Sequence, residues 1–188
     1  RVGGWFASDA GESQVERIQF ADGTVWDAAF IKHALLQGTA GDDYLIGYGT
    51  DDVLDGGAGN DTLIGKTGND TYVFGLGYGH DTVIDTDNTP GNADVVTLTA
   101  DVLPGDVTLK RGGDDLFVMI NGTSDRLQIK NWFASEDSRI ESIRFADGTV
   151  WDSSVMQNAI SNPTDTDDYL VGTTSGDVID GGAGNDKI

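Results

Sequence analysis

A nine-residue phrase repeats between residues 38 and 84, and its clearest copy is Gly-Gly-Ala-Gly-Asn-Asp-Thr-Leu-Ile at residues 56–64. Short repeats of fixed length indicate stacked identical units in place of an ordinary globular core. Copies begin at Gly38, Gly47, Gly56 and Gly65, at Leu76 after a two-residue slip, and again at Pro163, Gly172 and Gly181. The sixth position is acidic in every copy: Asp43, Asp52, Asp61, Asp70, Asp81, Asp168, Asp177 and Asp186. The eighth position is always apolar, so all copies keep one register.

Each phrase divides into a six-residue loop and a three-residue strand. Glycine in the loop allows the positive φ angles that tight turns require. In the strand, the apolar eighth residue points inward between two outward neighbours. Two phrases then make one 18-residue coil, and stacked coils make two parallel sheets over a thin apolar core. The predicted fold is dominated by β-structure: a parallel β-roll with flanking antiparallel strands and short capping helices.

Loops two phrases apart stack on the same side of such a roll and bring acidic residues together. Three pairs are predicted: Asp43 with Asp61, Asp52 with Asp70, and Asp61 with Asp81. Carboxylates a few ångströms apart repel by about 1 kcal/mol in water, and by more in a less polar setting. A hard cation reverses this repulsion. Ca²⁺ suits the cage because it accepts about six to eight oxygens at flexible angles, whereas Mg²⁺ requires a near-ideal octahedron.

The pattern resembles the RTX repeat, the haemolysin-type calcium-binding nonapeptide, over residues 38–84 and 163–188. This resemblance implies a β-roll with Ca²⁺ between stacked loops, bound by the sixth-position aspartates and by loop carbonyls. The further ligands that it implies are Gly41, Gly56, Ala58, Gly59, Thr67, Gly68, Gly79 and Gly184. Asp61, Asp70 and Asp186 are the strongest aspartates, each in a loop with Gly at its first and fourth positions. Thr50 and Ser175 replace the fourth Gly elsewhere, so those sites are expected to be looser or empty.

The composition agrees with a solenoid that needs a metal. Of 188 residues, 27 are Gly and 32 are Asp or Glu against 11 Lys or Arg, which gives a net charge of −21. Without the ion, self-repulsion and sparse apolar content are expected to leave the rolls disordered. The shortage of basic residues argues against nucleic acid as a partner. No apolar run approaches the roughly 20 residues that span a bilayer, and the absence of Cys excludes a disulfide-stapled fold.

A second, larger repeat surrounds the first. Residues 5–35 recur as residues 132–160, and the segment Phe-Ala-Asp-Gly-Thr-Val-Trp-Asp at 20–27 returns unchanged at 145–152. Its Asp-Gly pair predicts a hairpin, and its last residue, Asp27 or Asp152, predicts a helix N-cap. One face of each helix is expected to be buried: Phe30, Ile31, Ala34 and Leu35 in the first copy, and Val155, Met156, Ala159 and Ile160 in the second. We expect each helix to lie across a first coil and to cover its open end.

Between the first roll and the second cap, alternating apolar residues predict strands around 95–98, 107–109, 116–120 and 127–129 that extend the roll as an antiparallel sheet. Residues 125–133 and the hairpin after them resemble the domain often found beside RTX repeats. Trp132, Phe133 and Trp151 are predicted to be core residues. Five parts follow: 1–37, the cap of a preceding module; 38–87, the first roll; 88–130, flanking strands; 131–162, the second cap; and 163–188, the start of a truncated second roll.

The sequence does not predict an enzyme. His33 and His80 are the only histidines, and they lack a zinc-protease spacing; His33 is expected on an exposed helix face and His80 at a variable loop position. No Gly-x-Ser-x-Gly elbow occurs. A carboxylate pair that hydrolyses glycosides is singular, whereas these carboxylates recur, so one static purpose explains them all.

The resemblance implies a calcium-triggered folding module of a large bacterial protein exported by type I secretion, and so a secreted, extracellular or cell-surface location. Extracellular calcium modules bind with Kd around 10⁻⁴–10⁻³ M, so cytosolic calcium leaves such sites empty. The expected partners are calcium ions and neighbouring modules of the same polypeptide. The alternative is an adhesin or carbohydrate-binding module whose surface takes a carbohydrate or host ligand. Asp61→Ala is expected to be the most damaging change, because Asp61 can bridge the loops before and after it.

Overall fold

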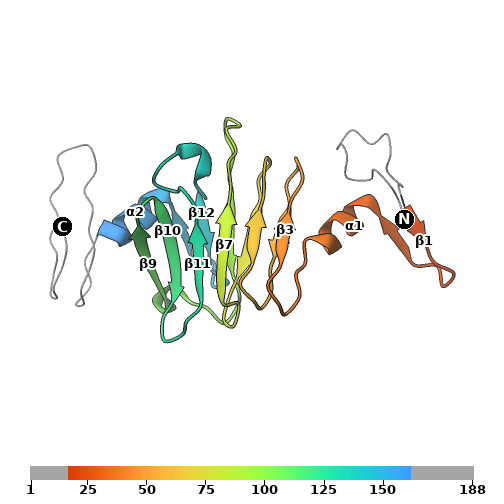
Figure 1. Cartoon of the computed structure of the whole chain (residues 1–188), viewed down its shortest axis with the longest axis horizontal. Coiled ribbons are helices and arrows are strands. Elements are labelled where there is room, and N and C mark those ends of the chain that lie inside the picture. Colours follow the sequence, from red (N-terminus) through yellow and green to blue (C-terminus); the bar gives the residue numbers. More distant parts are fainter. Residues whose placement is uncertain (1–16, 162–188) are drawn as a thin grey trace.

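The structure, a computed structural model, describes residues 17–161 and contains two facing sheets (Figure 1). The first sheet has the order β3 (Tyr44–Ile46), β5 (Thr62–Ile64), β7 (His80–Ile84), β11 (Arg126–Ile129), β10 (Asp115–Ile120) and β9 (Val107–Gly112). The second has the order β13 (Val150–Asp152), β12 (Ser142–Arg144), β8 (Val95–Leu98), β6 (Thr71–Phe74) and β4 (Val53–Asp55). A separate hairpin joins β1 (Arg17–Gln19) to β2 (Val25–Asp27). The short helices are α1 (Ala28–Leu35), α2 (Ser153–Ser161), η1 (Pro104–Asp106) and η2 (Glu136–Ser138).

Successive phrases supply strands to the two sheets in turn, as the repeat predicts. Parallel pairing aligns Tyr44 with Thr62 and Val53 with Thr71, an advance of 18 residues per coil. The next pair aligns Thr62 with Thr82, an advance of 20, which is the two-residue slip. The predicted parallel β-roll is therefore confirmed.

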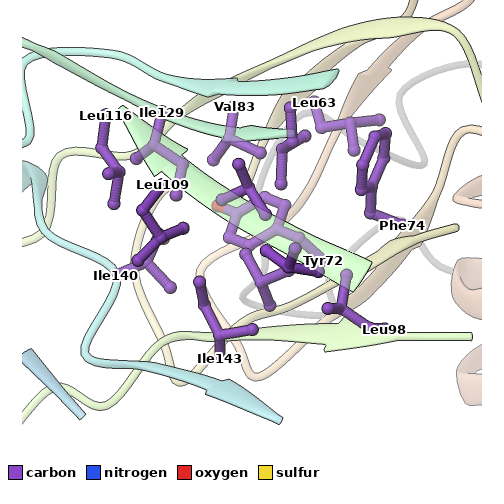
Figure 2. Close-up of a cluster of buried hydrophobic side chains, with 14 of the residues drawn as sticks. Leu63, Tyr72, Phe74, Val83, Leu98, Leu109, Leu116, Ile129, Ile140 and Ile143 are labelled. Carbon is purple, nitrogen blue, oxygen red and sulfur yellow. The ribbon is translucent and has the colours of Figure 1, made fainter. Parts of the chain in front are cut away.

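Eighth-position side chains from both sheets form the core of the roll. Leu54, Leu63, Tyr72 and Val83 are fully buried, and Leu45 is 9% exposed at the end of the roll. Figure 2 shows Leu63 and Val83 from the first sheet facing Tyr72 and other side chains from the second. The core continues without a break into the flanking strands, through the buried residues Leu98, Leu109, Leu116, Ile129, Ile140 and Ile143.

The flanking strands join the roll in parallel and become antiparallel only beyond the junction. β8 pairs in parallel with β6, so the second sheet continues past residue 87, the predicted end of the roll. β11 pairs in parallel with β7, and only β10 and β9 then extend the sheet antiparallel, through turns at Gly113 and Gly122 with positive φ. The predicted antiparallel extension is thus correct for the outer strands and wrong for the first strand on each sheet.

Both predicted helix N-caps are present. The Asp27 carboxylate accepts the amide of Phe30, and the Asp152 carboxylate accepts the amide of Val155. Each satisfies a first-turn donor that has no partner within its helix. Trp132 is fully buried and donates its indole N–H to the Ile140 carbonyl. Two further predicted core aromatics are only partly buried against the same core: Phe133 and Trp151.

The predicted burial of the two helices is largely wrong. No residue of α1 is buried: Phe30 is 45% exposed and Leu35 49%. In α2, Met156 is buried and Ile160 partly buried, while Val155 and Ala159 are exposed. Figure 1 shows α1 leading away from the roll toward β1 and β2, and so not lying across the first coil.

Strand pairing explains the difference between the two caps. β12 pairs with β8, which attaches the second cap to the main core, and Ile143 and Phe145 are consequently buried. Within residues 17–161, β1 pairs with β2 alone. Its equivalent residues Ile18 and Phe20 remain 38% and 40% exposed. None of the described helices is long and apolar enough to cross a bilayer.

Candidate metal centre

One row of aspartates runs along the loops that precede the first sheet. The Asp43 amide donates to Asp61 Oδ1 over 2.8 Å, and the Asp61 amide donates to Asp81 Oδ1 over 2.9 Å. One oxygen of each carboxylate therefore ties its own loop to the loop before it. The predicted pairs of Asp61 with Asp43 and with Asp81 are confirmed.

A second row runs along the other sheet and is longer than predicted. The Asp52 amide donates to Asp70 Oδ1 over 2.9 Å, which confirms that pair, and the Asp70 amide donates to Asp94 Oδ1 over 2.7 Å. Glu141 extends the row, because its carboxylate accepts the Asp94 amide. The sequence reasoning missed Asp94 because a longer loop precedes it. A usable signal was present: Asp94 stands two residues before the buried Val96, the spacing between sixth and eighth positions in every phrase.

The second carboxylate oxygen has different partners in the aspartates of the first coil, here called outer, and in those of the later loops, here called inner. In the first coil, Asp43 Oδ2 accepts the Thr39 amide and Asp52 Oδ2 accepts the Tyr48 amide, both over 2.6 Å. Both amide donors stand at the second position of their phrases. The corresponding oxygens of the inner aspartates are buried and have no hydrogen-bond partner: Asp61 Oδ2, Asp70 Oδ2 and Asp81 Oδ2. A buried polar atom without a partner carries its full desolvation cost, so these three oxygens are expected to bind a ligand.

Backbone conformation at the second position accounts for this difference. The inner phrases have positive φ there, 77° at Gly57 and 84° at Lys66. The Gly57 amide donates to Asp55 and so does not occupy the carboxylate of Asp61. In the phrase of Asp81 the amide of Gly77, with φ 79°, donates to Asp125.

Glycine at the first position makes room for the free oxygen. A Cβ added to Gly56 would lie 2.3 Å from Asp61 Oδ2, and one added to Gly65 would lie 2.2 Å from Asp70 Oδ2. At the fourth position Gly59 has φ 147°, and a Cβ there would lie 2.8 Å from the backbone of Gly41. The repeat glycines therefore serve two purposes, close stacking of loops and access to the carboxylates.

Burial raises the pKa of the inner carboxyl groups. It raises the pKa of Asp70 to about 8 and that of Asp81 to about 7, against hydrogen bonds from the amides of Asp52 and Asp61 that favour the ionised form. The pKa of Asp61 is raised for the same reason. Neighbouring carboxylates add to each shift. Without a cation, the rows hold negative charge in a setting that disfavours it.

Three buried carboxylates lie close together at the end of the second row, where the last repeat loop contacts the loop between β7 and β8. One oxygen from each of Asp70, Asp85 and Asp94 lies within 4.8 Å of the other two. Ca²⁺–oxygen distances are about 2.3–2.6 Å, so all three oxygens can contact one ion. Sequence reasoning missed Asp85 as well, because it stands directly after β7, where the repeat places Gly. Asp70 bridges two coils as Asp61 does and also belongs to this cluster, so Asp70→Ala is expected to be at least as damaging as Asp61→Ala, whose effect stays a prediction.

Most other predicted ligands lie in the stacked loops. Gly41, Gly56, Ala58, Gly59 and Gly79 belong to loops of the first row, and Thr67 and Gly68 to a loop of the second. Their carbonyls as calcium ligands stay a prediction. The predicted ligands of the last three phrases lie outside the described residues: Asp168, Asp177, Asp186 and Gly184. His33 is exposed on α1, as predicted. His80 is also exposed, but it is the first residue of β7 and so does not lie in the predicted loop.

Comparisons with known proteins agree with this geometry. A family model described as the RTX calcium-binding nonapeptide repeat (4 copies) matches residues 37–72 and 163–188. A second, the haemolysin-type calcium binding protein related domain, matches residues 1–29 and 115–154. The chain is also 36% identical over 117 residues to the iron-regulated protein FrpA of Neisseria meningitidis serogroup C, a match that covers 61% of this chain and 10% of that protein. Over these residues the chain is therefore similar to RTX repeats and to the haemolysin-type related domain, and Ca²⁺ is the ion that such repeats bind.

Proposed function

We propose that this chain is a calcium-triggered folding module, without catalytic activity, of a larger bacterial protein that is exported by type I secretion and folds outside the cell. The observation that supports it most is the set of buried, unpartnered oxygens on Asp61, Asp70 and Asp81. Each belongs to a carboxylate whose other oxygen accepts the backbone amide of the aspartate in the preceding stacked loop. The coils can stack only if something compensates these charges, and Ca²⁺ does so.

The available calcium then decides whether the roll folds. At about ten times Kd, one bound ion stabilises the folded state by about 1.4 kcal/mol. The three inner aspartates, taken as one site each, therefore give about 4 kcal/mol. A whole domain is stable by only about 5–15 kcal/mol. Because extracellular modules bind with Kd around 10⁻⁴–10⁻³ M, the chain stays unfolded at cytosolic calcium and folds outside.

Circular dichroism and sedimentation velocity on the 188-residue chain test this proposal. Freed of metal at pH 8, the chain should be expanded with little β signal. Millimolar Ca²⁺ should restore a compact β structure cooperatively, and Mg²⁺ at the same concentration should do so poorly, because it dehydrates reluctantly and demands octahedral geometry. A metal-free chain that is as compact as the calcium-loaded one at pH 8 contradicts the proposal.

A further inference from the structure

We infer that Asp70, Asp85 and Asp94 form a distinct calcium site, tighter than the other sites of the roll, in which Asp85 supplies a third carboxylate at a position that is Gly in the repeat. This inference rests on the proposed function, because it concerns an ion bound within the same roll. It adds a ligand that the nonapeptide pattern does not contain and an order in which the sites fill.

The register of the sheets places Asp85 at this position. β5 and β7 pair Ile64 with Ile84, so the residues that follow them, Gly65 and Asp85, are stacked neighbours. Gly65 lacks the Cβ that would lie 2.2 Å from Asp70 Oδ2. The space above Gly65 therefore holds the Asp70 carboxylate and the Tyr72 hydroxyl, and this hydroxyl is hydrogen-bonded to Asp85. Asp94 closes the group by its hydrogen bond from the Asp70 amide.

The hydrogen bonds of the cluster leave oxygens free for a ligand. Asp70 is 0% exposed and Asp85 2% exposed, and Asp70 Oδ2 and Asp85 Oδ1 have no partner. The other oxygen of Asp85 accepts the Tyr72 hydroxyl, which holds the side chain in place. Asn92 donates its amide N–H to Asp94 Oδ2 over 2.6 Å, and its own Oδ1 is buried and unpartnered. Carboxylate and amide oxygens are the ligands that Ca²⁺ takes in proteins.

Charge sets this site apart from the other pairs in the rows. The pair of Asp61 and Asp81 offers two carboxylates to one ion. The cluster offers three, and the affinity of a calcium site rises with the number of charged ligands. The cluster is therefore expected to fill first as calcium rises and to empty last during chelation.

Isothermal titration calorimetry with Asp85→Asn tests the inference. The substitution removes one charge and keeps an oxygen that can accept the Tyr72 hydroxyl. We expect one tight ion in the unsubstituted chain, and in Asp85→Asn a loss of at least about tenfold in the affinity of that ion. The matched control is Asp114→Asn, which removes one charge from an exposed turn and should leave the tight ion unchanged. Equal tight binding in Asp85→Asn and in the control overturns the inference.

Terbium luminescence gives a second readout if Asp85→Asn does not fold. Tb³⁺ binds oxygen ligands as Ca²⁺ does, and the ring of Tyr72 is joined to the cluster through Asp85. The first equivalent of Tb³⁺ should give emission excited through tyrosine, and Tyr72→Phe should remove most of that emission. An unchanged signal in Tyr72→Phe places the first ion elsewhere and refutes the site.

The outcomes separate this inference from the proposed function. If the metal-free chain unfolds and Asp85→Asn keeps the tight ion, the folding module stands and the three-carboxylate site does not. If the metal-free chain is already compact while Asp85→Asn loses the tight ion, the site stands and the folding trigger does not.

Discussion

In the metal-free chain at low pH, protons should neutralise the buried carboxylates in place of calcium. Burial raises the pKa of Asp70 to about 8 and the pKa of Asp81 and Asp85 to about 7, from an ordinary value of 3.8. The folded state therefore binds protons more tightly than the unfolded state. The stabilisation from these protons is full below about pH 4 and is lost as the pH rises through 7 and 8. Metal-free chain that is unfolded at pH 8 should consequently fold on acidification.

The raised pKa values give the size of the effect. Between its unfolded and folded pKa values, each group changes the free energy of unfolding by about 1.4 kcal/mol per pH unit. Three such groups change it by at most about 4 kcal/mol per pH unit below pH 7. A change of two pH units therefore alters the free energy of unfolding by an amount comparable with the stability of a whole domain, about 5–15 kcal/mol. The transition should therefore be steep and lie between about pH 5 and pH 7.

Circular dichroism across this pH range measures the transition. Metal is removed with a chelating resin, because EGTA loses its affinity for calcium when it is protonated. Asp70→Asn is the matched variant, since its amide is a permanently neutral copy of the protonated carboxyl group. It should fold without metal at a higher pH than the unsubstituted chain, with a shallower dependence on pH, and should bind calcium more weakly.

A metal-free chain that does not fold on acidification would contradict the role given to the buried carboxylates. If the metal-free chain gains no β signal between pH 8 and pH 5, while calcium restores it at pH 8, repulsion among the buried carboxylates is not what keeps the coils apart. If Asp70→Asn needs as much acid as the unsubstituted chain, Asp70 is not a main source of that repulsion.

Two further substitutions test the roll itself. Gly65→Ala should weaken calcium binding strongly in a calorimetric titration, because its Cβ would lie 2.2 Å from Asp70 Oδ2; Gly105→Ala, with nothing within 4 Å of its added Cβ, should not. Leu63→Ala should lower the free energy of unfolding in saturating calcium by about 2–5 kcal/mol in urea denaturation, since it leaves a cavity in the core. Ile64→Ala, on the outward face of the same strand, should cost clearly less, and equal costs for the two would contradict the inward orientation of the eighth position.

The repeat predicted the roll well because its information is local and periodic. Every phrase carries its own turn glycines, its inward apolar residue and its acidic residue, so stacking follows from the period alone. Prediction failed where the period is interrupted. The loop between β7 and β8 is longer than a phrase, so Asp85 and Asp94 fell outside the register although the structure brings them beside Asp70. Parallel pairing of β11 with the roll depends on contacts distant in sequence, and the only local signal for the pairing of β8 is the spacing between Asp94 and Val96.

The sequence also does not predict which sixth-position aspartates have an oxygen free to bind a metal. All sixth-position aspartates look equivalent in the sequence, yet the structure divides them by the second oxygen. Asp43 Oδ2 is satisfied by the Thr39 amide, whereas Asp61 Oδ2 has no partner. Positive φ at the second position causes the difference, and Lys66 adopts it without being Gly. The choice between a closed and an open carboxylate therefore follows the backbone conformation at the second position, which the residue type alone does not determine.

The two caps show most clearly that the same local structure can be buried in one place and exposed in another. The same eight residues form a hairpin and an Asp-capped helix in both copies, so these residues determine the turn and the cap. Burial differs nonetheless: Phe145 is 4% exposed and Phe20 40%. The second hairpin pairs through β12 with β8, the last strand of a roll, and this pairing supplies the apolar surface that covers Phe145. Helical spacing of apolar residues identifies the face that can be buried, but a neighbouring strand decides whether it is, which is why burial differs between α1 and α2 although their apolar residues have the same spacing.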